Sequence, residues 1–158
     1  MRRKKYFIIA FMAIFILGIP ASYAIYQSSN DVSVQSTTGD IICHLSIDTD
    51  DSYIENNEPY FLITVDNFET VGGVTSVSSV IVDYTITIEN ESGSQGLFRY
   101  IDEDGNTNST GTEKAVIKKR IGNEKTSQKI KVFTTADTNL ETDVKFKVKL
   151  DAVQADMS

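Results

Sequence analysis

Hydrophobic and polar residues alternate along most of the chain beyond residue 26. In the segment 80–88, apolar side chains and Tyr84 occupy every second position, and mainly polar residues lie between them. A period of two is typical of a β-strand with one buried and one exposed face, because successive side chains point to opposite sides. The same pattern predicts strands over 32–35, 41–47, 60–65, 97–101, 115–121, 129–132 and 144–151.

Turn sequences separate these eight predicted strands. Runs rich in Asp, Asn, Gly and Ser occupy 48–52, 55–59, 71–73, 91–94 and 104–106. Short strands with frequent turns and no helical crossovers between them favour antiparallel pairing. The pattern therefore predicts an all-β protein, an antiparallel two-sheet sandwich that is jelly-roll-like, over residues 37–158.

The first 24 residues have a different character. Basic residues at 2–5 precede an apolar run over 6–19, which Pro20 ends. A basic start, a short apolar helix and a small-x-small exit are typical of a secretory signal peptide. The residues expected at the cleavage site are Ser22, Ala24 and Ile25. We therefore expect 1–24 to be a signal peptide, signal peptidase to be a partner, and the rest of the chain to be secreted.

A retained membrane anchor is the alternative interpretation of this segment. Residues 6–26 are 21 largely apolar positions, just enough to cross a bilayer as a helix. The domain would then be tethered at the cell surface. The shorter uninterrupted run and Pro20 favour cleavage.

The charge of the chain excludes one class of partner. The net charge is −7. Four of the 15 basic residues and none of the 22 acidic residues lie in 1–24, so 11 basic against 22 acidic residues leave −11 after cleavage. Binding to nucleic acid requires a surplus of Lys and Arg to neutralise phosphates. We therefore expect no nucleic-acid partner.

The charges are also unevenly distributed. No Lys or Arg occurs between Lys5 and Arg99, whereas 25–98 contains 12 acidic residues. From Arg99 onward, 11 basic and 10 acidic residues nearly balance. An acidic, soluble face is the favoured interpretation, and head-to-tail contact between acidic and basic ends of different subunits is the alternative.

The chain has few residues that could carry catalysis. Its single histidine, His44, has no HExxH motif or nucleophile elbow around it, so we predict no catalytic residues and no enzyme. The single cysteine, Cys43, cannot form an internal disulfide. It shares a strand face with Ile41, Leu45 and Ile47, which predicts a buried apolar role; a reactive or intermolecular thiol is the alternative.

Two acidic clusters are weak candidates for calcium, and no other cofactor is expected. The candidate ligands are Asp48, Asp50, Asp51, Asp102 and Asp104. Calcium prefers six to eight oxygen ligands, and in an EF-hand they follow a fixed register. Gly105 follows the last of them too early for that register, and Asp-Gly is a preferred hairpin dipeptide. Turn formation is therefore favoured over calcium binding at both clusters.

The segment 25–36 is a possible donor strand. Most of it is polar, but Val32 and Val34 are spaced so that both could enter a groove. A segment that does not pair within its own domain can add to an open sheet edge of another molecule. The predicted donor residues are Ile25, Tyr26, Val32 and Val34. The alternatives are pairing within the same domain and fraying as an N-terminus.

Several features together resemble the TasA/camelysin family. They are Ser22-Tyr23-Ala24 with a polar start after it, the acidic, cysteine-poor all-β pattern, and the ending Val148-Lys-Leu-Asp-Ala-Val-Gln-Ala-Asp156. The resemblance implies an exported protein with a jelly-roll fold that assembles into extracellular fibres of the biofilm matrix. It also implies that an N-terminal strand of one subunit completes a sheet of the next. Camelysin-like members have been described as metallopeptidases. This chain has no HExxH motif, so we do not expect that activity here.

We therefore expect a secreted structural subunit that polymerises head to tail with other copies of itself, in contact with other matrix components. The alternative is a monomeric or membrane-tethered extracellular β-sandwich that binds carbohydrate, protein or calcium through its loops. Fibres that persist after deletion of 25–36 would exclude strand donation. Absence of fibres from the intact secreted chain would favour the binding module.

Overall fold

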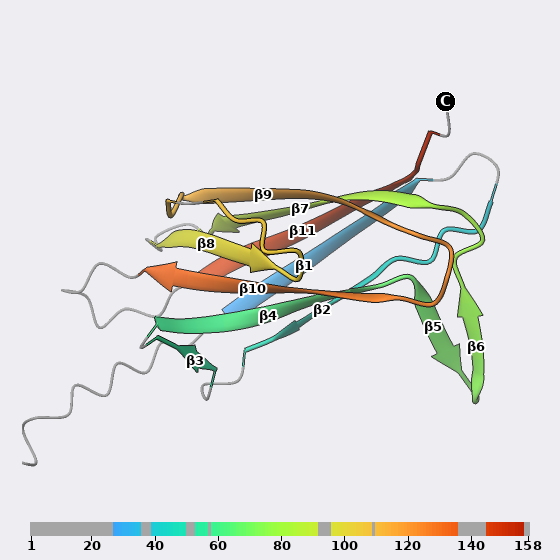
Figure 1. Ribbon diagram of the computed structural model, residues 1–158, viewed down its shortest axis with the longest axis horizontal. Coiled ribbons are helices and arrows are strands. Elements are labelled where there is room, and N and C mark those ends of the chain that lie inside the picture. The colour runs from blue at the N-terminus through green and yellow to red at the C-terminus, as the bar shows by residue number, and fades with distance from the viewer. Residues whose placement is uncertain are drawn as a thin grey trace, which may run out of the picture.

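The computed structural model describes residues 27–35, 39–49, 53–56, 58–91, 96–108, 110–135 and 145–156. Regular secondary structure in these ranges consists of β-strands (Figure 1). The strands are β1 (Gln27–Gln35), β2 (His44–Asp48), β3 (Ile54–Glu55), β4 (Glu58–Asp66), β5 (Phe68–Val71), β6 (Val74–Val77), β7 (Val82–Asn90), β8 (Leu97–Asp102), β9 (Lys114–Ile121), β10 (Ser127–Thr135) and β11 (Lys145–Gln154).

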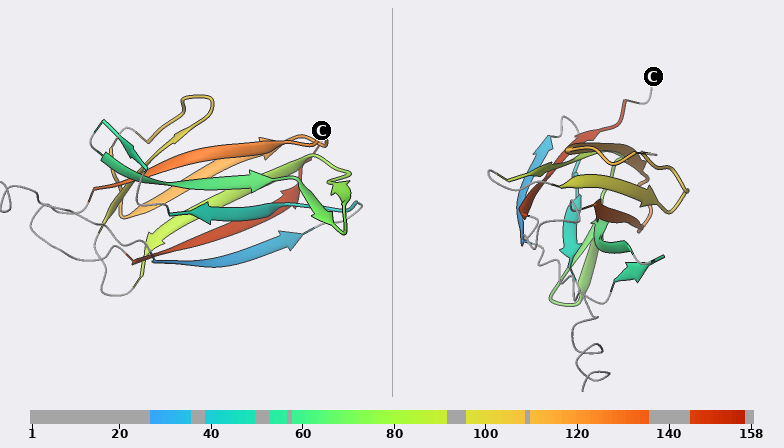
Figure 2. Two further views of the ribbon diagram at one scale, coloured as in Figure 1. Left: turned by 90° about the horizontal axis from the view of Figure 1, so that it is seen from below. Right: turned by 90° about the vertical axis from the view of Figure 1, so that its left-hand side faces the viewer.

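Two larger sheets form the body of the molecule. One has the strand order β1-β11-β7-β9, and the other has the order β2-β4-β10-β8, with β3 beside β4. Figures 1 and 2 show the two sheets as adjacent layers. From β4 to β11 the strands of these sheets alternate between the two layers, so that partners in a sheet are distant in the sequence. All strand pairs among the described residues are antiparallel except β1 with β11.

The two sheets share one hydrophobic core. Phe61 of β4 stacks on Phe146 of β11 with ring centroids 4.3 Å apart, and Phe98 of β8 meets Phe146 edge-on at 5.9 Å. All three rings are fully buried. Along β7, buried side chains alternate with partly exposed ones, as the period of two predicts. This alternation is what lets each sheet present an apolar face to the other.

The structure confirms the all-β class with antiparallel sheets, and it contains all eight strands predicted from the sequence. Three short strands, β3, β5 and β6, were not predicted. Both β5 and β6 have mostly exposed residues on both faces, so no alternation marks them in the sequence. The predicted signal peptide, its helix and the cleavage residues Ser22, Ala24 and Ile25 lie outside the described residues. Within the described ranges, no helix has the length and hydropathy needed to cross a membrane.

The hairpin β5–β6 projects from one end of the two sheets (Figure 1). Gly72 and Gly73 at its tip have φ angles of 59° and 82°, the pair of positive values that a tight two-residue hairpin turn requires. Val71 and Val74 beside them are 70% and 69% exposed, so the tip is an apolar surface without cover. We call residues 68–77 the arm.

The base of the arm is held by a buried asparagine. Asn67 Nδ2 donates to the carbonyl oxygens of Gly122 and Glu124 at 2.7 and 2.6 Å, and Asn67 Oδ1 accepts from the Thr126 amide at 2.8 Å. The Ser78 amide donates to the Asn67 carbonyl at 2.8 Å. One side chain thus fastens the start of the arm to the turn between β9 and β10.

Candidate functional site

The pairing of β1 with β11 is the most unusual feature of the described fold. The nine residues Gln27–Gln35 pair in parallel with Lys145–Val153, and β1 forms the edge of its sheet. Parallel neighbours cannot be joined by a tight hairpin, and here more than a hundred residues separate them in the sequence. The edge strand therefore depends on main-chain pairing with one strand, far from it along the chain.

Two of the predicted donor residues fall inside this pairing. Val32 is opposite Leu150 and Val34 is opposite Ala152, and both partners on β11 are buried. The structure thus pairs the segment within its own chain, the alternative to donation left open by the sequence. Ile25 and Tyr26 lie outside the described residues.

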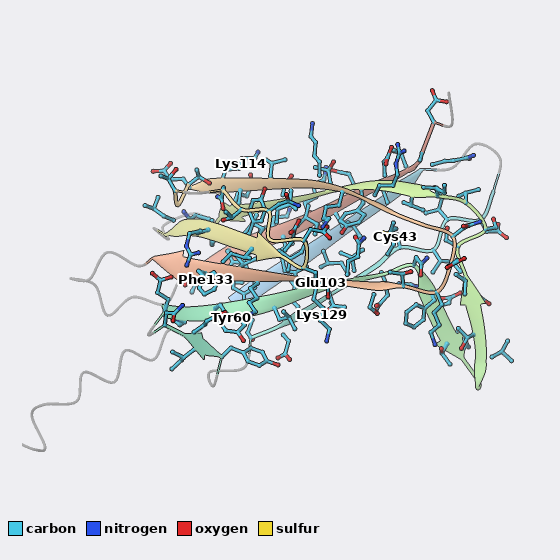
Figure 3. All side chains as sticks on the ribbon, viewed as in Figure 1. Cys43, Tyr60, Glu103, Lys114, Lys129 and Phe133 are labelled. Carbon is cyan, nitrogen blue, oxygen red and sulfur yellow. The ribbon has the colours of Figure 1, made fainter. Side chains whose placement is uncertain are left out.

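A row of alternating charges crosses the sheet that contains β1. The Asp31 carboxylate of β1 forms an ion pair with Lys147 of β11, which is opposite Glu89 of β7 in the strand register. Glu89 in turn forms an ion pair with Lys114 of β9, with 3.2 Å between Oε2 and Nζ (Lys114 is labelled in Figure 3). The hydrogen bond from Lys147 to Asp31, more than the other nearby carboxylates, raises the pKa of that lysine. We call these four residues the charge row.

The charge row belongs to a wider pattern. Five ion pairs among the described residues join an acidic group before residue 99 to a basic group at residue 99 or later. Besides the two in the charge row, they are Glu58 with Arg99, Asp83 with Arg120 and Glu55 with Lys131. The two halves of the sequence, which differ in charge, are thus interleaved as neighbouring strands. The uneven charge distribution is used for pairing within the chain.

Cys43 and His44 point to opposite sides, as the alternation predicts: Cys43 into the core and His44 to the surface. Cys43 is buried in the core. Burial, and secondarily the nearby Asp66 carboxylate, raises the pKa of its thiol to about 11. His44 is exposed on β2, with its Nε2 3.4 Å from the Glu69 carboxylate of the arm. A protonated thiol and a surface histidine on opposite faces of the strand do not form a catalytic pair.

The second predicted calcium cluster is held together by a lysine. Asp102 is buried, and its carboxylate accepts from Asn106 and from Lys119 Nζ, the latter at 2.8 Å. Asp104 accepts from the same Nζ at 2.6 Å. Burial opposes the charge of Asp102, but the hydrogen bonds from Lys119 and Asn106 outweigh it and lower the pKa of this carboxyl. Lys119 therefore supplies the positive charge at this cluster.

The turn that follows Asp102 explains the local sequence. Gly105 has a φ of 79°, and its amide donates to the Asp102 carbonyl at 3.0 Å. The Asp104 amide donates to the Asp102 carboxylate at 3.0 Å. The Asp-Gly dipeptide thus forms the tight turn that was favoured over a calcium site.

The first predicted calcium cluster is only partly described. Asp48 accepts a hydrogen bond from the Tyr53 hydroxyl at 2.8 Å, and Asp50 and Asp51 lie outside the described residues. In the ranges that the structure describes, no three His, Cys, Asp or Glu side chains gather in a way that could hold a metal ion.

An aromatic cluster lies near the start of β4 (Tyr60 and Phe133 are labelled in Figure 3). Tyr53 stacks on Tyr60 at 5.3 Å, and Tyr60 meets Phe133 at 5.4 Å. Arg99 lies 4.2 Å from the Phe133 ring centroid, and Lys131 lies 5.4 Å from that of Tyr60. These rings therefore pack against one another and against cations.

Comparisons with protein-family models, with curated proteins and with solved structures found no match. Sequence reasoning missed the charge row, the Asp102–Lys119 pair and the role of Asn67. The alternation of Lys145, Lys147 and Lys149 along the predicted last strand was the visible signal for the first of these. The strand partners that complete each contact depend on tertiary pairing, which the sequence pattern does not specify.

Proposed function

We propose that the protein is a secreted structural subunit, a jelly-roll-like β-sandwich that polymerises into extracellular fibres of a biofilm matrix. In this assembly β1 of one copy pairs with β11 of the next. The observation that carries the proposal is the edge position of β1, held in parallel by one strand that is remote in the sequence. The nested pairing of β1 with β11, β4 with β10 and β7 with β9 supports the jelly-roll description.

An edge strand of this kind can be exchanged between copies. The contacts that β1 makes with β11 are the same whether the two strands belong to one chain or to two. When β1 is exchanged, the edge of β11 that it leaves is covered by β1 of another copy. That edge is then not free to pair with unrelated strands. The three residues 36–38 separate β1 from Gly39, where a Cβ would lie 2.5 Å from Val80 Cγ1. Gly39 therefore belongs to the body of the fold, and β1 is the part available for exchange.

Two sequence features support the location and the partners. The first 24 residues have the pattern of a secretory signal, and cleavage leaves an acidic chain with a net charge of −11. The Ser22-Tyr23-Ala24 exit and the closing Gln154-Ala-Asp156 resemble the TasA/camelysin family. The expected partners are signal peptidase, other copies of the chain and further matrix components, with no catalytic activity.

Electron microscopy of the purified chain beginning at Ile25 tests this function. We expect fibres from that chain and none from a chain that lacks 25–36. A matched control replaces the exposed arm valines, Val71→Ser with Val74→Ser, and should leave strand donation intact. Circular dichroism must show β structure in each variant. Unchanged fibres after the deletion would exclude strand donation.

An extracellular binding module is the second candidate, and one observation favours it. The arm carries two exposed valines at its tip, a surface suited to contact with another protein. If the intact chain stays monomeric at all concentrations and salt conditions tested, this candidate becomes the better one.

A further inference from the structure

We propose that Asp31 and Lys147 select the strand that β1 joins, so that this ion pair determines the partner in assembly. The inference rests on the fibre function proposed above and names the contact that makes donation specific. It is drawn from the position of Asp31 at the end of the charge row, where β1 supplies the outermost member.

The composition of β1 gives Asp31 this role. The strand reads QSSNDVSVQ, in which Asp31 is the one charged residue and two valines are the apolar ones. So polar a strand is weakly specified by hydrophobic contacts, and its main-chain groups could pair with any open edge. A charge is therefore the feature by which one edge can be distinguished from another.

The available edges differ in charge. β11 presents Lys145, Lys147 and Lys149 at every second position. The other sheet edges are β2, β8 and β9. β2 reads HLSID and has no Lys or Arg. Addition of β1 to β2 would leave Asp31 without a lysine on the neighbouring strand. β8 and β9 carry basic residues, but most of these already form ion pairs within the fold: Arg99, Lys114, Lys119 and Arg120.

On β11, Asp31 is opposite Lys149 in the register and forms its ion pair diagonally with Lys147. A shift of two residues toward the C-terminus would place Asp31 opposite Asp151 instead of Lys149.

Lys147 is equally constrained on its other side. It is opposite Glu89 in the register, and Glu89 is paired with Lys114. Charges of alternating sign on neighbouring strands stabilise a sheet, and like charges opposite one another destabilise it. An exposed ion pair of this kind contributes little affinity by itself. It can still give specificity, because a strand that brings a like charge to the same position is repelled.

Charge exchange between two variants tests the inference on the full chain beginning at Ile25. Asp31→Lys places a lysine beside Lys147, and Lys147→Asp places an aspartate beside Asp31. Each variant alone should require about tenfold more protein to form fibres than the unmodified chain. An equimolar mixture should assemble at a clearly lower protein concentration than either variant alone, because each donor then meets an acceptor of opposite charge. It should not fully reach the unmodified threshold, because Lys147→Asp also places an aspartate opposite Glu89. The double variant, Asp31→Lys with Lys147→Asp, should recover to the same extent as the mixture.

Two controls separate charge matching from loss of fold. Lys129→Asp makes the same charge change on β10, in the other sheet (Figure 3), and should leave the threshold unchanged. Asp31→Asn keeps the shape of the side chain. The fibre threshold of the unmodified chain should rise about two- to threefold between low and high salt, and that of Asp31→Asn should not.

The outcomes are distinguishable. If each single variant assembles alone as well as the unmodified chain, Asp31 and Lys147 do not select the partner, although fibre formation stands. If the double variant assembles but the mixture does not, the pair acts within one chain and the inference is overturned. If the unmodified chain forms no fibres, the proposed function itself has failed.

Discussion

At the scale of single residues, the Asp102–Lys119 pair shows how burial decides the value of a charge. The side chain of Asp102 is 3% exposed and that of Lys119 is 12% exposed, whereas the pairs of the charge row are roughly half exposed. Exposed pairs contribute little to stability. A buried carboxylate that loses its partner remains charged in a medium that solvates it poorly. The alternation over 115–121 places Lys119 on the same face as the buried Ala115, Ile117 and Ile121, but it gives no sign that Asp102 is the partner of its charge.

Lys119→Met should therefore lower the free energy of unfolding by about 3 kcal/mol, because Asp102 is left buried without its cation. Urea denaturation followed by circular dichroism measures this change. Lys118→Met removes an exposed lysine from the neighbouring position and should cost less than about 0.5 kcal/mol. The double variant Asp102→Asn with Lys119→Met should be more stable than Lys119→Met alone; equal stability would show that the unpaired charge is not the cause.

The same pair predicts an acid dependence of stability. The pKa of Asp102 is lowered in the folded protein, so folding favours the carboxylate. Its contribution is fully present above the unfolded pKa of about 3.9 and is lost as the pH falls toward the folded value. Urea midpoints between about pH 6 and pH 2.5 should therefore drop less for Asp102→Asn than for the unmodified chain. Parallel curves for the two proteins would contradict this assignment.

Cys43 gives a second residue-scale prediction. Since burial raises the pKa of its thiol to about 11, the folded protein should react very slowly with a thiol reagent at pH 8. Unfolding in guanidinium chloride should restore the reaction, because the thiol then returns to its ordinary pKa. Absorbance during reaction with Ellman's reagent measures both rates. Rapid labelling of the native protein would instead identify Cys43 as an accessible, reactive thiol.

At the scale of elements, the alternation of side chains identified the longer strands, and in β4, β7, β9 and β11 the structure shows one face of the strand in the core. It could not identify the arm, whose residues are exposed on both faces, although the Val71-Gly-Gly turn was visible. It also could not give the partner of β1. Register and partner depend on which remote strand closes the edge, and the two valines of β1 do not contain that information.

The arm depends on Asn67 for its attachment. Asn67→Ala removes three hydrogen bonds and leaves carbonyl oxygens and an amide of the β9–β10 turn to find other partners. We expect a loss of about 2–3 kcal/mol in the free energy of unfolding. Hydrogen exchange should also become faster at the Thr126 amide. The exposed Asn123 in the same turn is the matched control, and its replacement by Ala should change stability little. Equal effects of the two substitutions would show that Asn67 does not fasten the arm.

At the scale of the whole molecule, the uneven distribution of charge along the sequence is resolved by topology. Strands from the acidic half lie beside strands from the basic half, and five ion pairs join them. The same complementarity of charge applies at the edge of β11 to which β1 adds. A strand that adds at β11 extends the row Lys114–Glu89–Lys147 if it carries a negative charge. The fold class followed from local alternation, but this complementarity depends on which strands become neighbours.

A crosslink between different chains distinguishes exchange of β1 from its pairing within one molecule. Ser33 of β1 is opposite Asp151 of β11, so Ser33→Cys in one chain and Asp151→Cys in another become disulfide partners only if the strands come from two copies. We expect the mixed, oxidised variants to give a covalent dimer on a non-reducing gel after assembly. Cys43 is buried and should not compete. A chain with both substitutions should give a ladder of multimers from fibres and an internal disulfide from monomers. Internal disulfides alone in fibrous material would mean that the copies are joined by another surface.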